Sequence, residues 1–132
     1  MALSLCQTIA LDGAVVVTTP SELARVDVLR GVSMLRSLGV RSLALVENMA
    51  YFECGSCTER HRVFGPGHVQ ELREQLDLAA DACFEVPLSP AISAENERGS
   101  TRPTPRPKEP VRPPFDQLAR HIVRDASRTR AV

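Results

Sequence analysis

The chain has 132 residues, of which 43% are apolar and 4% aromatic, and its formal net charge is zero. This apolar fraction suits one soluble globular domain, and no stretch reaches the roughly 18–20 apolar residues that span a bilayer. So few aromatic side chains argue against binding of single-stranded nucleic acid by base stacking.

The charges are distributed unevenly along the chain. Residues 1–97 contain 7 Lys/Arg and 13 Asp/Glu, whereas residues 98–132 contain 9 and 3. We interpret the basic tail as a solvated face, with RNA or membrane contact as the alternative, and expect no DNA or membrane partner. The start has no basic segment of a secretory signal, so we expect a cytoplasmic protein, or an organellar one if a transit peptide precedes Met1.

The first elements alternate between helix and strand. Helical spacing of apolar residues predicts a short helix over residues 2–10. The run AVVVTT at 14–19 is typical of a strand that is buried on both faces of a parallel sheet. TTPSE then predicts a helix start in which Thr19 is the cap and Glu22 completes a capping box, with Pro20 in the first turn.

This helix is expected to run to about Leu38, where Gly39 stops it, with Gly31 packed closely on the sheet. RSLALVEN at 41–48 predicts a second buried strand and therefore a βαβ unit. Ligands of such sheets bind beyond the carboxyl ends of the strands, where Glu47, Asn48 and Met49 fall.

The second half predicts further helices and one more strand. We expect a helix near 67–77, a strand at 82–88 and a short helix around 91–97. Six prolines between Gly99 and Pro114 predict an extended segment. Apolar residues at helical spacing predict a final amphipathic helix that packs back on the domain, with His121 on its polar side; they are Phe115, Leu118, Ala119, Ile122 and Val123.

Cys54 and Cys57 form a Cys-x-x-Cys pair, a spacing that places two thiolates at the edge of one metal centre. Three completions of the site remain open from the residues alone. A two-fold dimer could hold one [4Fe-4S] cluster, His61 and His68 could complete a zinc site, or the pair could be a redox switch. Two further cysteines, Cys6 and Cys83, lie on apolar faces and are expected to be inert thiols.

Several motifs in order resemble the Mrp/ApbC-like P-loop ATPases, iron–sulfur cluster carriers related to MinD and ParA. They are GAVVVTTPSE, DVLRGVSMLRSLGV, LALVENMAYFECGSC, VFGPG, FEVPLSPAIS and FDQLARHI. The resemblance covers nearly the whole chain. It implies an α/β fold, a P-loop NTPase-type parallel sheet flanked by helices.

The resemblance also implies a homodimer in which Cys54 and Cys57 of each subunit hold a bridging [4Fe-4S] cluster. ATP, with Mg²⁺, would govern cluster transfer to apo iron–sulfur proteins. Asn48 would contact the adenine, and the stretch around Pro87 would lie along the base.

One departure from the family is large. The sequence contains no Gly-x-x-x-x-Gly-Lys-Ser/Thr loop, so the phosphates of ATP lack their usual cradle, and we expect no ATP hydrolysis by this chain alone. We therefore expect residues 1–98 to be the C-terminal half of such a domain, from a truncated gene model or a split or degenerate protein. Residues 99–114 would be a Pro-rich basic crossing, and 115–132 the final helix.

Overall fold

The computed structural model describes residue 4, residues 8–90, residue 92 and residues 113–129. Most of the helix expected at 2–10, of the helix expected around 91–97 and of the Pro-rich stretch lies outside the described residues. Within the described part of the chain, no helix is long and apolar enough to cross a membrane.

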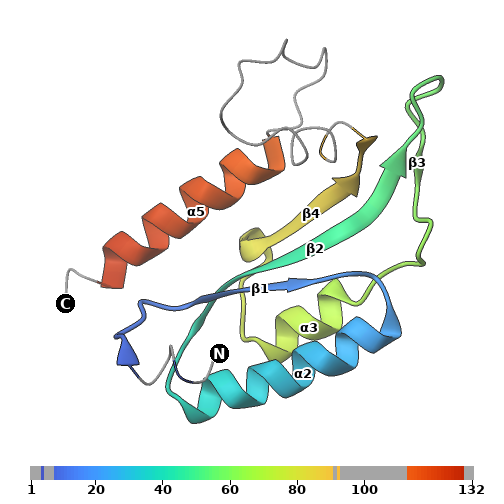
Figure 1. Ribbon diagram of the computed structural model, residues 1–132. Coiled ribbons are helices and arrows are strands. Elements are labelled where there is room, and N and C mark those ends of the chain that lie inside the picture. Colours follow the sequence, from blue (N-terminus) through green and yellow to red (C-terminus); the bar gives the residue numbers. More distant parts are fainter. Residues whose placement is uncertain (1–3, 5–7, 91, 93–112, 130–132) are drawn as a thin grey trace.

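The fold is a mainly parallel sheet between two helical layers (Figure 1). In the sheet, β2 (Ser42–Glu53) lies between β1 (Ala14–Thr18) and β4 (Cys83–Leu88), both parallel to it. The two-residue strand β3 (Arg60–His61) pairs antiparallel with the end of β2. One face carries α2 (Glu22–Ser37) and α3 (Val69–Gln75), and the other carries α5 (Pro113–Thr129). The predicted α/β class and βαβ unit are confirmed.

The core lies between β2 and the two helices α2 and α3. Alternate side chains of a strand point to opposite faces, and Leu45 points from β2 into this layer, where it is fully buried together with Leu72 of α3. The surrounding buried residues are Val32, Leu76, Leu78 and Ala82. The last of these belongs to a 3₁₀ turn, η1 (Ala80–Ala82), which leads into β4. Burial of this layer is what holds α3 against the sheet.

The start of α2 differs from the prediction. Ser21, with extended backbone, is the N-cap, and its Oγ accepts the N–H of Ala24 at 3.2 Å. Thr19 is therefore not the cap, and the Glu22 carboxylate bonds to Nε of Arg25 at 2.9 Å instead of closing a capping box. The helix starts two residues later because Ser21 offers the same hydroxyl acceptor after Pro20.

The sequence predicts structural roles for two glycines, one in α2 and one after it. Gly39 has a φ of +68° immediately after the helix, so the predicted C-terminal stop is confirmed. The prediction of close packing at Gly31 is wrong, because a Cβ built there has no neighbouring atom within 4 Å. Gly31 instead lines a groove beside β1.

Helix α5 packs on β2 and β4, as its apolar pattern predicts. Two expectations about it are wrong. Pro113 and Pro114 belong to its first turn, where a missing N–H costs no hydrogen bond, and not to the extended segment. His121 faces the sheet, with Nε2 3.0 Å from the carbonyl oxygen of Leu43 and its ring edge-on to Phe84 at 5.5 Å. The carbonyl and the aromatic ring give this polar side chain partners at the interface.

Candidate functional site

Strand β2 is longer than predicted. It carries the cysteines away from the packed sheet and helices, which we call the body. The expected strand ended at Asn48, whereas β2 continues to Glu53, beyond the end of β1 at Thr18. Its pairing with β4 changes register between Asn48 and Phe52, and Met49 has a φ of +59°. The irregular residues separate an inner part of β2 from an outer arm, which forms a hairpin with β3 (Figure 1).

Both cysteines of the pair are free thiols in the loop of this hairpin. The N–H of Cys54 donates to the carbonyl of Glu59 at 3.0 Å, and the N–H of Thr58 donates to the carbonyl of Cys54 at 2.8 Å. Thr58 adopts a φ of +58° to close the turn. Cys54 is half-buried and Cys57 is exposed. Since both belong to the loop of the hairpin, they lie at the outer end of the arm.

The backbone of the loop favours a thiolate at the first cysteine. Hydrogen bonds from the N–H groups of Ser56 and then Cys57 lower the pKa of the Cys54 thiol. Donors directed at a sulfur stabilise its charged form, and the thiolate is the form that binds metals. The residues after Cys57 form a turn and β3, whereas the redox hypothesis requires a helix that starts at the first cysteine.

The two histidines predicted as zinc ligands lie in different surroundings. His61 is next to Cys57 and Glu59, and one ligand atom from each of the three lies within 4.8 Å of the others. His68 is the N-cap residue of α3, and its Nε2 lies 3.3 Å from Oε2 of Glu22 at the start of α2. The structure therefore brings His61 to the cysteine hairpin and gives His68 a carboxylate partner on the body.

A buried carboxylate lies where the hairpin arm meets the body. Glu47 is fully buried; its Oε1 accepts the N–H of His68 at 3.2 Å, while its Oε2 has no hydrogen bond and lies 3.7 Å from Nη1 of Arg62. Nη2 of the same arginine bonds to Oε1 of Glu85 at 2.7 Å. Burial raises the pKa of the Glu47 carboxyl, and the neighbouring charge of Glu85 acts in the same direction.

The loop after the hairpin is fitted around this carboxylate. Gly67 has a φ of +76°, and a Cβ at this position would overlap the carboxylate oxygens of Glu47. Both conditions require glycine. The sequence predicts Glu47 at the edge of the sheet but indicates no role for it. The signal for such a role is a carboxylate inside the apolar run LALVEN, followed by two glycines in FGPG.

The two residues predicted to contact adenine lie on the neighbouring strands β2 and β4. Asn48 is opposite Val86 in the β2–β4 ladder, so it is one residue from Pro87 in register. Both side chains are partly exposed. The side-chain oxygen of Asn48 accepts the N–H of Met49 at 3.0 Å, which leaves its amide N–H₂ to donate.

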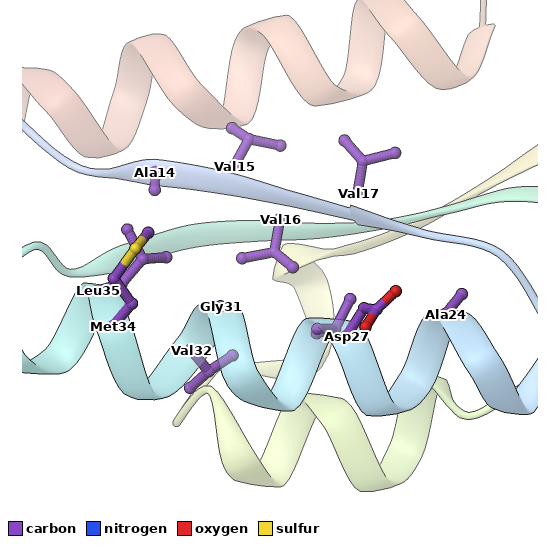
Figure 2. Close-up of a pocket in the computed structure, with 11 residues that line it drawn as sticks. Ala14, Val15, Val16, Val17, Ala24, Asp27, Gly31, Val32, Met34 and Leu35 are labelled. Carbon is purple, nitrogen blue, oxygen red and sulfur yellow. The ribbon is translucent and has the colours of Figure 1, made fainter. Parts of the chain in front are cut away.

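A groove of about 500 Å³ runs between β1 and α2 (Figure 2). Val16 points from β1 toward the helix, whereas Val15 and Val17 point to the opposite face. Asp27 is the one titratable residue among those that line the groove, and β1 pairs only with β2 among the described residues. The groove therefore offers no cluster of titratable groups for catalysis.

Comparisons with known proteins agree with this geometry. The family model described as ParA: NUBPL iron-transfer P-loop NTPase matches residues 1–123. The chain is 31% identical over 122 residues to the iron–sulfur cluster transfer protein NUBPL of Dictyostelium discoideum, covering 92% of this chain and 37% of that protein. It is 34% identical over 118 residues to an iron–sulfur cluster carrier protein of Aquifex aeolicus, covering 89% and 32%.

A solved structure is also similar. It is a nucleotide-binding protein of Archaeoglobus fulgidus in complex with ADP, in which cobalt was found; the TM-score is 0.60 at 35% identity, over 70% of this chain and 37% of that one.

The fold is thus that of a P-loop nucleotide-binding protein. The chain belongs to the ParA family of NUBPL-type iron-transfer P-loop NTPases, as the sequence motifs indicate. It spans about a third of the length of these relatives, 37% and 32%.

Proposed function

We propose that this chain is the cluster-binding part of an iron–sulfur cluster transfer protein. The cargo is a [4Fe-4S] cluster held between two copies of the chain, with Cys54 and Cys57 of each copy as ligands. The recipients are apo iron–sulfur proteins. The observation that carries the proposal is the pair of free thiols at the outer end of an arm that projects from the body.

The arm suits a cluster that is shared and then released. Its outer residues make few contacts with the body, so a second copy can approach both sulfur atoms without rearrangement of the sheet. The backbone N–H groups that lower the pKa of Cys54 favour the thiolate form, which is the form that binds a cluster. The names of the relatives, cluster transfer and cluster carrier proteins, support the same function.

Nucleotide would control this transfer. We propose that the Asn48 amide and the Pro87 stretch lie along the adenine of ATP, since Asn48 pairs with Val86, the residue before Pro87, on the neighbouring strand. The sequence contains no Gly-rich phosphate loop, so the phosphates and Mg²⁺ would be held by residues outside this sequence. ATP hydrolysis would then need those residues as well.

Zinc bound by Cys54, Cys57, His61 and His68 in an interaction module is the weaker hypothesis. His68 already faces the Glu22 and Glu71 carboxylates, and its backbone N–H is bonded to Glu47. Recruiting it to the hairpin would break these contacts.

Anaerobic reconstitution with ferrous iron and sulfide tests the proposal. We expect a brown chromophore, a dimer by size-exclusion chromatography and about two iron atoms per chain. Cys54→Ala and Cys57→Ala should each abolish all three. Cys83→Ala is the matched control, because burial raises the pKa of that thiol and it lies in β4. A colourless monomer whose hairpin thiols are both alkylated after reconstitution would contradict the proposal.

A further inference from the structure

We propose that the hairpin carries a second metal site, in which Cys57, Glu59 and His61 of one chain bind a single divalent transition-metal ion such as Zn²⁺. This site shares only Cys57 with the proposed cluster site and needs neither Cys54 nor a second copy of the chain. Its failure and that of the cluster proposal can therefore be distinguished.

The geometry of the three side chains is the starting point. One ligand atom from each lies within 4.8 Å of the other two. Bonds of about 2.0–2.3 Å around a tetrahedral ion bring ligand atoms to roughly 3.5 Å from one another. The side chains of Glu59 and His61 are 71% and 51% exposed, so both can close the remaining distance by rotation without disturbing a packed core.

Hydrogen bonds and strand pairing with β2 hold the backbone that carries these ligands. Glu59 accepts the N–H of Cys54, and His61 is in register with Phe52 of β2. Arg60, between them, is held by other contacts: its guanidinium lies 4.5 Å from the ring centre of Tyr51 and its Nε is 3.2 Å from Oε2 of Glu53. Arg60 is thus occupied by Tyr51 and Glu53, whereas Glu59 and His61, on either side of it in sequence, lie near Cys57.

The set of donors indicates the class of ion. A thiolate, an imidazole and a carboxylate suit ions of intermediate softness, such as Zn²⁺, Co²⁺ and Fe²⁺, whereas Mg²⁺ and Ca²⁺ prefer oxygen ligands. Three protein ligands leave a fourth position for water or an incoming ligand. On binding, the Cys57 thiol releases its proton to solvent and the imidazole binds as the neutral form.

Sharing Cys57 makes the two sites mutually exclusive. A single chain can hold the ion through Cys57, but a bridging cluster needs that sulfur as one of its four ligands. The single-ion state is therefore the state of the separate chain, and cluster loading must displace the ion. Occupancy of Cys57 by an ion would also protect this exposed thiol from oxidation before loading.

Metal titration of the full chain under anaerobic, reducing conditions tests the site. Co²⁺ is the probe, followed by displacement with Zn²⁺, because cobalt bound to sulfur has visible absorption and zinc does not. We expect one ion per chain in a monomer, with a sulfur-to-cobalt absorption band. His61→Ala and Glu59→Ala should each weaken binding by more than the roughly 10-fold that loss of a residue supporting a ligand costs, because each removes a ligand itself. His61→Cys, which restores a ligand, should retain the ion.

Three matched variants make the test decisive. Cys54→Ala should keep cobalt affinity while losing the cluster, and His61→Ala should lose cobalt affinity while keeping the cluster. His68→Ala, at the start of α3, should leave cobalt affinity unchanged. Circular dichroism of each variant checks that it is folded.

The proposal is overturned if Cys54→Ala weakens cobalt binding as much as His61→Ala does, because the two cysteines would then form the site. It is also overturned if one ion binds per dimer, or if His61→Ala and Glu59→Ala bind cobalt like the unmodified chain. Normal cobalt binding without cluster formation would support this site and contradict the proposed function.

Discussion

The packed body and the hairpin arm use the same strand in opposite ways. In the inner part of β2, Leu45 is fully buried against α3, whose Leu72 is fully buried in turn. At the outer end, Cys57, Glu59 and His61 are all exposed. Folding free energy comes from burial, whereas ligand exchange needs access to solvent and to partners. The difference indicates that changes in the body alter stability and changes in the arm alter binding.

The largest effect is expected in the body. Leu72→Ala should lower the free energy of unfolding by about 2–5 kcal/mol, because it leaves a cavity under a fully buried side chain. Leu23→Ala, at a position of α2 that is 74% exposed, should change it by less than about 0.5 kcal/mol. Urea denaturation measures both. Equal effects would mean that α3 is not part of the core.

The junction between body and arm can be broken at Gly67. Gly67→Ala adds a side chain at a positive φ and against the Glu47 carboxylate, so it should cost about 2 kcal/mol or more. Gly39→Ala has a similar φ but open space around its Cβ, so it should cost only the backbone strain, about 1 kcal/mol. If the two variants are equally stable, the loop is not fitted around Glu47.

The ionisation of Glu47 gives a second test of the same junction. Burial raises the pKa of the folded carboxyl above its unfolded value, so the native state binds the proton more tightly. The contribution of Glu47 to the free energy of unfolding is fully present below the ordinary glutamate pKa. It is lost as the pH rises through the raised pKa of the folded state. Near neutral pH, Glu47→Gln should be more stable than the unmodified chain by about 1 kcal/mol, since the neutral amide avoids the cost of burying the carboxylate charge.

Unfolding of both proteins between about pH 4 and about pH 8 checks this sign. The advantage of Glu47→Gln should grow as pH increases. A difference that shrinks with increasing pH would mean that Arg62, at 3.7 Å, stabilises the carboxylate more than burial destabilises it.

The smallest effects on stability are expected at the end of the arm. Without metal, Cys57→Ser and His61→Ala should each change the free energy of unfolding by less than about 0.5 kcal/mol, because both side chains are exposed. The same denaturation experiment measures this. Losses above about 1 kcal/mol would show that the arm contributes to the fold, and the contrast with Leu72 would disappear.

Local patterns in the sequence predicted most of the elements. AVVVTT, the helix that ends at Gly39, and the apolar line of the last helix all correspond to elements of the structure. The prediction that the first strand is buried on both faces is wrong, because Val17 is 60% exposed. The other misses have two causes. Ser21 replaced Thr19 as the cap through a local bond from the N–H of Ala24, because two neighbouring hydroxyls can cap the same helix. His121 turned toward the sheet because the carbonyl of Leu43, which is distant in sequence, gives it a partner there.

The candidate site, too, was predicted only in part from the sequence. Cys54, Cys57 and Asn48 were identified from spacing and motif resemblance, and the sequence alone determined the α/β class and the family to which it belongs. Only the tertiary structure decided that Glu47 is buried beneath Gly67, that His68 turns to Glu22, and that His61 joins Cys57 and Glu59. The physical reason is that hydrophobic periodicity and turn chemistry act within a few residues, whereas burial and the approach of ligand atoms depend on how distant segments pack.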